Sequence, residues 1–319
     1  MNKISRWFRL WAVDRPKIVV IVGPTASDKS AVGMELAGHI KAEIINADSM
    51  QVYRYMDIGT AKPSVEERKS VRHHLIDILY PDEEFSAALF REEARQAIGA
   101  LEERGKRAMV VGGTGLYIKA LTSGLIRGGE VDPVIRERLQ SEARAGGREQ
   151  LYQRLQEVDP PTAEQLHPHD TYRIIRALEV YERTGRPISV LRKKHLFQEG
   201  PYQTLKIGLG VDREELYKRI DRRVDGMIQQ GLVEEVRQLL EMGYAPSLKA
   251  MQSLGYKQII NLLQGEYDHA EAVRLIKRDT RRYARRQITW FKADPEIRWF
   301  AVPQGRNAII EMIKGFWRN

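Results

Sequence analysis

The 319-residue chain contains no cysteine, which excludes disulfide bridges and thiolate metal sites. This absence fits a reducing cytoplasm, where we expect the protein to act. The chain also lacks an apolar run of the roughly 18–20 residues that cross a bilayer. Its opening, MNKISRWFRLWAVDRPK, interrupts a short apolar stretch with Arg6, Arg9 and Asp14. We therefore expect no membrane segment and interpret this opening as a surface extension.

The chain has no acidic excess, because 52 Lys and Arg outnumber 43 Asp and Glu and give a net charge of +9. Much of the basic excess lies in residues 277–292, KRDTRRYARRQITWFK, where Asp279 is the single acid. At helical spacing, Arg278, Arg282 and Arg286 form one stripe. A second stripe beside it comprises Lys277, Arg281 and Arg285. Concentrated positive charge favours a polyanionic partner, and the alternative is a solvated basic face without one.

Short β-branched runs alternate with helical patterns over most of the chain, and the 42% hydrophobic content is enough for a full core. The expected strands are residues 17–23, 42–48, 106–113 and 205–212. The expected helices between and after them are about 29–40, 86–104, 213–242 and 269–292. Strands that alternate with helices predict an α/β fold with a parallel sheet flanked by helices.

Between the third and fourth expected strands, residues 130–200 contain only helical patterns. We interpret them as an all-helical insertion domain, and residues 1–129 with 201–319 as the core. The insertion is net neutral, with equal numbers of basic and acidic residues.

Residues 23–30, GPTASDKS, follow the first strand and open a helix. They match the phosphate-loop pattern G-x-x-x-x-G-K-[ST] at Gly23, Lys29 and Ser30. Backbone N–H groups and the helix N-terminus would bind phosphate, Lys29 would reach its terminal oxygens, and Ser30 would ligate Mg²⁺. The core is thus predicted to be P-loop NTPase-like. The alternative is an incidental strand-to-helix turn.

Asp28 stands where the pattern has its second glycine. That position usually needs a positive φ, which aspartate adopts at modest cost, so we expect the loop conformation to survive. A carboxylate at ~5–6 Å from a diphosphate, in an effective dielectric of about 20, would repel it by ~3 kcal/mol per unit charge. Reorientation of the side chain or bound Mg²⁺ would reduce this repulsion. We expect weaker phosphate binding than in a glycine loop, and a gain on Asp28→Gly.

Two further stretches should meet the loop at the carboxyl edge of the sheet. Residues 47–63, ADSMQVYRYMDIGTAKP, place Asp48 directly after the second strand, where a general base belongs. The alternative role for Asp48 is a helix N-cap. Residues 110–121, VVGGTGLYIKAL, supply a glycine-rich turn from which Thr114 and Tyr117 could line the same cleft. Adjacent His73 and His74 would point to opposite faces of a strand, so we expect a structural role for them.

Together these stretches resemble the tRNA dimethylallyltransferases, also called tRNA isopentenyltransferases. The resemblance rests on GPTASDKS, on ADSMQVYRYMDIGTAKP and on VGGTGLY at 111–117. HHLID (73–77), RIIRALEVYERTGRPIS (173–189), LGYKQ (254–258) and TRRYARRQITWF (280–291) extend it over residues 17–292. Asp28 is the clear departure from the family pattern.

The resemblance implies transfer of a dimethylallyl group from dimethylallyl diphosphate to the exocyclic amine of the adenosine 3′ of the anticodon, in tRNAs that read codons beginning with U. Thr25 would contact the bridging oxygen of the diphosphate, Lys29 and Ser30 with Mg²⁺ would neutralise its charge, and Asp48 would accept the amine proton. The whole diphosphate loop is Gly23, Pro24, Thr25, Ala26, Ser27, Asp28, Lys29 and Ser30. Further expected substrate contacts are Thr114, Arg136, Arg219 and Arg223.

The target adenosine would be extruded from its stack, and its neighbours read by stacking and edge contacts. The expected tRNA-binding residues, which would clasp the anticodon stem-loop, are Asp48, Ser49, Met50, Gln51, Tyr172, Arg173, Arg176, Gln252, Gly255, Tyr256, Lys257, Arg282 and Arg286. We expect the insertion to recognise RNA by shape more than by bulk charge, and the protein to act as a monomer.

Three other functions are compatible with parts of the sequence. A P-loop kinase that phosphorylates a small molecule with ATP would share the loop and the sheet, but would leave the basic helix unexplained. A prenyltransferase acting on free adenine nucleotides would leave the long insertion unexplained. A tRNA-binding protein with a donor site disabled by Asp28 would bind tRNA without prenylating it.

Overall fold

The computed structural model describes residues 15–125, 132–195, 200–302 and 304–318. The expected surface extension before residue 15, and the expected boundary between residues 129 and 130, lie outside this part. The chain divides into two compact units. One combines Met1–Thr122 with Pro201–Asn319, and the other is Ser123–Gly200.

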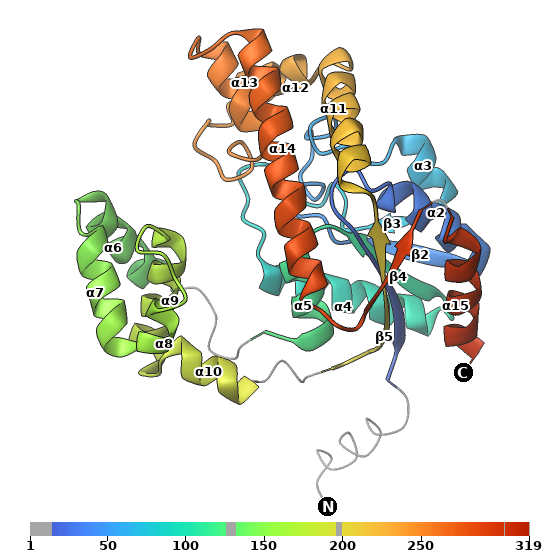
Figure 1. Cartoon of the computed structure of the whole chain (residues 1–319), viewed down its shortest axis with the longest axis horizontal. Helices are drawn as coiled ribbons and strands as arrows, with labels where there is room; N and C mark the ends of the chain where they lie inside the picture. The colour runs from blue at the N-terminus through green and yellow to red at the C-terminus, as the bar shows by residue number, and fades with distance from the viewer. Residues whose placement is uncertain (1–14, 126–131, 196–199, 303, 319) are drawn as a thin grey trace, which may run out of the picture. The chain divides into compact units, whose positions relative to one another are not determined.

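The first unit is built on a six-stranded sheet in the order β3-β2-β4-β1-β5-β6, in which every neighbouring pair is parallel. The strands are β1 (Lys17–Val22), β2 (Ala42–Asn46), β3 (His73–His74), β4 (Arg107–Gly112), β5 (Gln203–Gly210) and β6 (Ile297–Ala301). The register places Ile18 of β1 opposite Ala108 of β4 and Thr204 of β5. The predicted parallel α/β sheet is confirmed, and β1 with its phosphate loop lies near the centre (Figure 1).

The sequence of β1, KIVVIV, is apolar throughout because both faces of the strand are covered by helices. Ile18 and Val20 belong to the cluster that includes buried side chains of the helices α4 (Ala87–Glu103), α11 (Arg213–Gln229) and α14 (His269–Lys292). Val19 and Ile21 point the other way, into a cluster with the helices α2 (Lys29–Ile40) and α15 (Arg306–Arg318). Alternation of side chains along the strand thus serves two buried layers at once.

The helices of the first unit are α2 (Lys29–Ile40), α3 (Val65–Ser70), α4 (Ala87–Glu103), α5 (Gly115–Ser123), α11 (Arg213–Gln229), α12 (Leu232–Glu241), α13 (Tyr256–Leu263), α14 (His269–Lys292) and α15 (Arg306–Arg318). The last residue of α5 falls in the second unit. The predicted helix 269–292 matches α14, which begins where the Asp268 carboxylate accepts the N–H of Glu271 at 2.8 Å. Its buried residues recur at helical spacing from Ala272 to Phe291, so one face packs inward.

The second unit consists of short helices around its own apolar core. They are α6 (Pro133–Arg144), α7 (Arg148–Val158), α8 (Pro160–Ala163), α9 (Thr171–Thr184) and α10 (Ile188–His195). Leu139, Leu155, Ile174 and Leu178 are among the buried side chains that hold these helices together. α9 ends at Gly185, whose φ of 65° is a left-handed conformation that glycine adopts without strain.

Candidate functional site

In the loop between β1 and α2, Asp28 has the left-handed conformation expected at the second glycine of the pattern. Asp28 has φ 59° and ψ 21°, and Ala26 has φ 62°. Aspartate tolerates the left-handed region better than most side chains, so the expectation that it keeps the loop conformation is confirmed. The loop opens directly into α2 at Lys29, which brings the helix N-terminus and its free N–H groups to the end of β1.

The Asp28 carboxylate is paired with a cation from another element. Nη1 of Arg219, on α11, donates to Oδ2 of Asp28 at 2.7 Å, while its Nε donates to Glu215 at 2.9 Å. Arg219 was expected to contact substrate, but it is not among the described residues that line the cavity at the loop. It instead compensates the negative charge that Asp28 adds to the loop.

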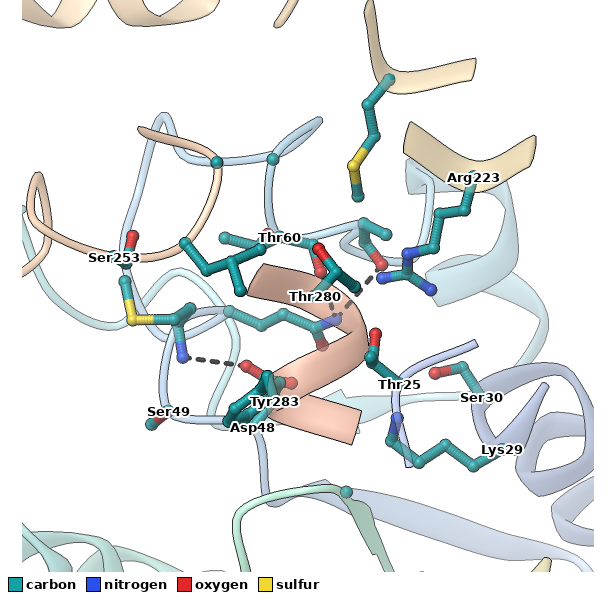
Figure 2. A pocket seen from close by; sticks show the side chains of 18 of the residues that line it. Thr25, Lys29, Ser30, Asp48, Ser49, Thr60, Arg223, Ser253, Thr280 and Tyr283 are labelled. Atoms are coloured by element: carbon teal, nitrogen blue, oxygen red, sulfur yellow. Dashed lines mark hydrogen bonds between the residues drawn. The ribbon is translucent and has the colours of Figure 1, made fainter. Parts of the chain in front are cut away.

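A cavity of about 350 Å³ opens at the carboxyl ends of the strands, beside the phosphate loop (Figure 2). Several segments distant in sequence contribute polar side chains to its lining. They include Thr25, Lys29 and Ser30 of the loop, Asp48, Ser49 and Gln51 after β2, Arg223 of α11, and Thr280, Tyr283, Arg286 and Gln287 of α14. The loop and Asp48, predicted to meet at this edge, therefore line one cavity.

Two partly buried cations, Lys29 and Arg223, line the part of this cavity beside the phosphate loop. Burial lowers the pKa of Lys29 to about 8, with nearby Arg223 acting in the same direction and Asp48 and Asp28 opposing it. Burial also lowers the pKa of Arg223. A cation with a depressed pKa is stabilised by any anion that enters, so this side of the cavity is suited to a phosphate group.

Asp48 lines the cavity close to both of these cations. Its Oδ1 accepts the N–H of Met50 at 2.9 Å, which makes a local turn. The alternative role as a helix N-cap is wrong, since the described residues after Asp48 form turns and the next helix, α3, begins at Val65. Asp48 also helps to raise the pKa of Tyr283, for which burial is the larger cause.

The glycine-rich turn supports the site from behind. Oγ1 of Thr114 accepts the N–H of Ser49 at 3.0 Å, so Thr114 positions the segment that carries Asp48. Neither Thr114 nor Tyr117 is among the described residues that line the cavity, and the prediction that they would do so is wrong. Tyr117 is buried and stacks on Phe90 with ring centroids 4.5 Å apart. Of the two histidines, His73 lines the cavity while His74 turns to Glu43, at 2.8 Å.

Gln287 of α14 is a site residue that the sequence did not reveal. Its Oε1 accepts the N–H of Thr25 at 2.8 Å, and its Nε2 donates to the carbonyl of Gly113 at 2.9 Å. A Cβ on Gly113 would lie 2.4 Å from Nε2, so this contact needs glycine. Gln287 thereby joins the phosphate loop to the glycine-rich turn. Gln287 lies within the arginine-rich segment 277–292, whose sequence pattern points only to its charged residues.

A second hollow of about 320 Å³ lies along α14. It is lined by Gln252, Ser253, Leu254, Lys257, Gln258, Asp279, Arg282 and Arg286. Arg286, Ser253 and Leu254 also line the first cavity. The expected RNA-binding residues of the segments 252–257 and 282–286 therefore lie together, next to the cavity that holds Asp48.

Only part of the predicted basic surface on α14 is available. Lys277 pairs with Asp225 at 2.6 Å and Arg281 pairs with Asp221, both on α11. Lys277 and Arg281 belong to the stripe that favours a polyanionic partner, but in the structure they hold α14 against α11. Arg282, by contrast, keeps about half of its side chain exposed, although it shares Asp279 with Arg278.

The remaining expected contacts belong to the helical unit. Arg136 and Arg176 donate to the fully buried Glu179 at 2.7 and 2.9 Å, which stabilises α6 against α9. Tyr172 and Arg173 expose about two thirds or more of their side chains at the start of α9. The substrate contact expected of Arg136, and the RNA contacts expected of Tyr172, Arg173 and Arg176, stay predictions.

The residues at the loop fit Mg²⁺ only in company with a phosphate ligand. Within the described ranges, no group of three or more histidine, aspartate or glutamate side chains could hold a metal ion alone. Ser30 offers a hydroxyl at the cavity wall, beside Lys29. Mg²⁺ prefers oxygen ligands and commonly takes most of them from substrate phosphates and water, so one protein hydroxyl suits it.

Known proteins share both the sequence and the fold of this chain. The family model described as IPP transferase matches residues 51–294. A tRNA dimethylallyltransferase of Geobacter metallireducens is 53% identical over 95% of this chain and 98% of that protein. The chain belongs to the tRNA dimethylallyltransferase family. Another member, from Geobacter sulfurreducens, is 48% identical over 96% of this chain and 98% of its own length.

Solved structures of this family have the same fold. The tRNA isopentenylpyrophosphate transferase of Bacillus halodurans aligns with a TM-score of 0.70 and 39% identity, over 94% of this chain and 96% of that one. A eukaryotic dimethylallyltransferase, described as acting on tRNA, aligns with a TM-score of 0.77 and 29% identity, over 90% of this chain and 74% of that one. In addition, the described part of the chain has no helix with the length and apolar character that crossing a bilayer requires.

Proposed function

We propose that this protein transfers the dimethylallyl group of dimethylallyl diphosphate to the exocyclic amine of the adenosine 3′ of the anticodon, in tRNAs that read codons beginning with U. The single observation that carries this proposal is the shared cavity. The phosphate loop, Asp48, the segment 253–256 and α14 all contribute residues to its lining. Family membership supports the same reaction.

The donor half of the cavity is suited to hold a diphosphate as a leaving group. Lys29 and Arg223 bring positive charge into a partly enclosed cavity, where fixed charges act more strongly than in open water. Thr25 lines the same cavity, and its backbone N–H is held by Gln287. Mg²⁺ bound with Ser30 would supply further neutralisation of the developing diphosphate charge. Each of these groups favours departure of the diphosphate.

The transfer itself moves one bond and one proton. The amine nitrogen of the adenosine forms a bond to C1 of the dimethylallyl group, while the bond from C1 to the diphosphate oxygen breaks and its electron pair leaves with the diphosphate. Asp48 accepts the amine proton as general base. Its hydrogen bond from the N–H of Met50 fixes the carboxylate in place for this step.

The acceptor half must admit a base that has left its stack. Ser49, Met50 and Gln51 border Asp48, and the second hollow along α14 continues the lining through Arg286. Arg282 and Lys257 in this hollow would contact the RNA backbone, and the exposed Tyr172 and Arg173 of the helical unit would contact the anticodon arm. The monomeric state and the cytoplasmic location stay predictions.

One assay tests the proposal against its rivals. The purified protein is incubated with Mg²⁺, dimethylallyl diphosphate and tRNA, and the nucleosides are analysed by mass for prenylated adenosine. We expect the product with the native protein and at least a hundredfold less with Asp48→Asn, which keeps the shape and the turn but has no basic carboxylate. Transfer of phosphate from ATP to a small molecule would favour the kinase instead.

Two control reactions complete the assay. A free adenine nucleotide offered in place of tRNA should remain unmodified, and its prenylation would favour the rival with a small acceptor. Retained tRNA binding without product in the native protein, together with product in Asp28→Gly, would favour a binding protein with a disabled donor site. The proposed function is then overturned for the native chain.

A further inference from the structure

Glu235, on α12, makes four hydrogen bonds to two segments that are distant in sequence. Its Oε2 accepts the backbone N–H groups of Asp57 at 2.9 Å and Ile58 at 2.7 Å. Its Oε1 accepts the N–H of Gly59 at 3.1 Å and the hydroxyl of Tyr256 at 2.6 Å. Three consecutive N–H groups thus converge on one carboxylate, an arrangement that binds anions well.

The two segments that Glu235 joins are both walls of the cavity. Gly59, Thr60 and Ala61 line it from one segment, and Ser253 to Tyr256 line it from the other. Thr60 and Ser253 are drawn in Figure 2, on the part of the cavity away from Lys29. Glu235 itself is not among the described residues of the lining, so it acts from behind the wall.

The contact between these walls is close enough to respond to Glu235. A Cβ on Gly59 would lie 2.5 Å from the Tyr256 ring, so backbone and ring are already in contact. Burial and the neighbouring Glu235 raise the pKa of Tyr256, so its hydroxyl keeps the proton that it donates to the carboxylate. The distance between the two walls is therefore fixed by the carboxylate of Glu235 and its four hydrogen bonds.

The 57–61 segment is also tied to the residues beside Asp48. Nε2 of Gln51 donates to the carbonyls of Thr60 at 3.1 Å and Ala61 at 3.2 Å. Gln51 lies three residues after the general base and lines the same cavity. A shift of the 57–61 segment would thus reach the place where the acceptor base must lie against Asp48.

We propose that Glu235 is a positioning residue for the acceptor substrate. Glu235 sets the distance between the 57–61 and 253–256 walls, and this distance determines where the extruded adenosine binds. This inference rests on the proposed function and assigns to α12 a part in substrate selection. None of these four hydrogen bonds of Glu235 involves Thr25, Lys29 or Ser30. The donor half should therefore be insensitive to it.

The test compares Glu235→Gln with Glu234→Gln, a matched change on the same helix at a mostly exposed glutamate that pairs with Arg237. The amide at residue 235 keeps one acceptor oxygen but turns an NH₂ group toward donors. We expect kcat/KM for tRNA to fall about tenfold or more in Glu235→Gln, through a higher KM or a lower kcat. The affinity for dimethylallyl diphosphate, titrated without tRNA, should stay within about twofold, and Glu234→Gln should behave as the native protein.

Tyr256→Phe is the second variant, because it removes one of the four hydrogen bonds without leaving a charge unpaired. It should lower kcat/KM for tRNA less than Glu235→Gln does, again with unchanged donor affinity. Equal loss of donor affinity in Glu235→Gln and Tyr256→Phe would assign Glu235 a merely structural role and overturn the inference. So would native tRNA kinetics in both variants. Absence of prenyl transfer in the native protein would instead overturn the proposed function.

Discussion

The guanidinium of Arg219 lies 2.7 Å from the carboxylate of Asp28, across the gap between α11 and the phosphate loop. This ion pair reduces the repulsion that an aspartate in the loop would exert on a diphosphate. The Asp28 side chain turns outward, with about 59% of it exposed, while that of Arg219 is 23% exposed. Asp28 keeps the left-handed backbone conformation that the second glycine of the pattern would have, and its negative charge has a local counter-charge.

Asp28→Gly should raise the affinity for dimethylallyl diphosphate, but only modestly. The loop conformation is already left-handed at this position, and glycine adopts it freely. Because Arg219 and solvent both screen the carboxylate, we expect a gain of about twofold to tenfold, well below the ~3 kcal/mol of an uncompensated charge. Titration calorimetry with Mg²⁺ measures it. An unchanged or lower affinity would mean that Asp28 is neutral or favourable in this loop.

Arg219→Ala should weaken donor binding by leaving the Asp28 charge uncompensated. Asp28→Gly should then restore much of the loss, so its benefit is larger in the Arg219→Ala background than in the native one. An exposed pair is worth about 0–1 kcal/mol, which predicts a coupling of up to about fivefold in the dissociation constants of the four proteins. Effects that simply add would show that the pair plays no part in donor binding.

Donor affinity should fall as pH rises through about 8, the lowered pKa of Lys29 in the free protein. A bound diphosphate raises this pKa, so binding above pH 8 requires uptake of a proton and becomes weaker by up to tenfold per pH unit. Lys29→Arg should keep its charge and lose this dependence, which separates Lys29 from titration of the ligand itself. A flat profile in the native protein would contradict the assignment.

The lowered pKa of Lys29 also predicts how the free energy of unfolding depends on pH. A lysine titrates at 10.5 when unfolded, and the folded protein releases its Lys29 proton near pH 8. The unfolded state therefore binds more protons between these values, and the contribution of Lys29 to the free energy of unfolding rises with pH across this window. Chemical denaturation of the native protein and of Lys29→Arg at pH 7.5, 8.5 and 9.5 should show a steeper rise with pH in the native protein.

The sequence could predict the elements whose signals are local. The apolar run of β1, the loop opening at Lys29 and the amphipathic pattern of α14 all depend on neighbouring residues, and the structure confirms them. The position of Asp48 at the carboxyl edge followed from general sheet geometry. These features were enough to place the loop and the carboxylate in one cavity.

The incorrect predictions concern side-chain contacts between separate elements. The periodicity of the sequence does not encode such contacts. The basic residues Lys277 and Arg281 looked like an RNA surface, but aspartates one helix away bind them. Tyr117 looked like a cleft residue, but Phe90 of α4 covers its ring. Glu235 and Gln287 gave no signal, because most of their hydrogen bonds go to backbone groups about 174 to 262 residues away.

Gln287→Leu should weaken donor binding and destabilise the protein. The change leaves the N–H of Thr25 and the carbonyl of Gly113 without their partner, and each unsatisfied buried group costs about 1–3 kcal/mol when water does not replace the partner. We expect dimethylallyl diphosphate affinity to fall about tenfold or more, because Thr25 and the loop lose their anchor. Gln258→Leu is the matched control, since this glutamine is also buried but bonds to Asp279 and Gly255 beside the second hollow. It should leave donor affinity unchanged, and an equal loss of donor affinity in both variants would show that buried glutamines here contribute only general stability.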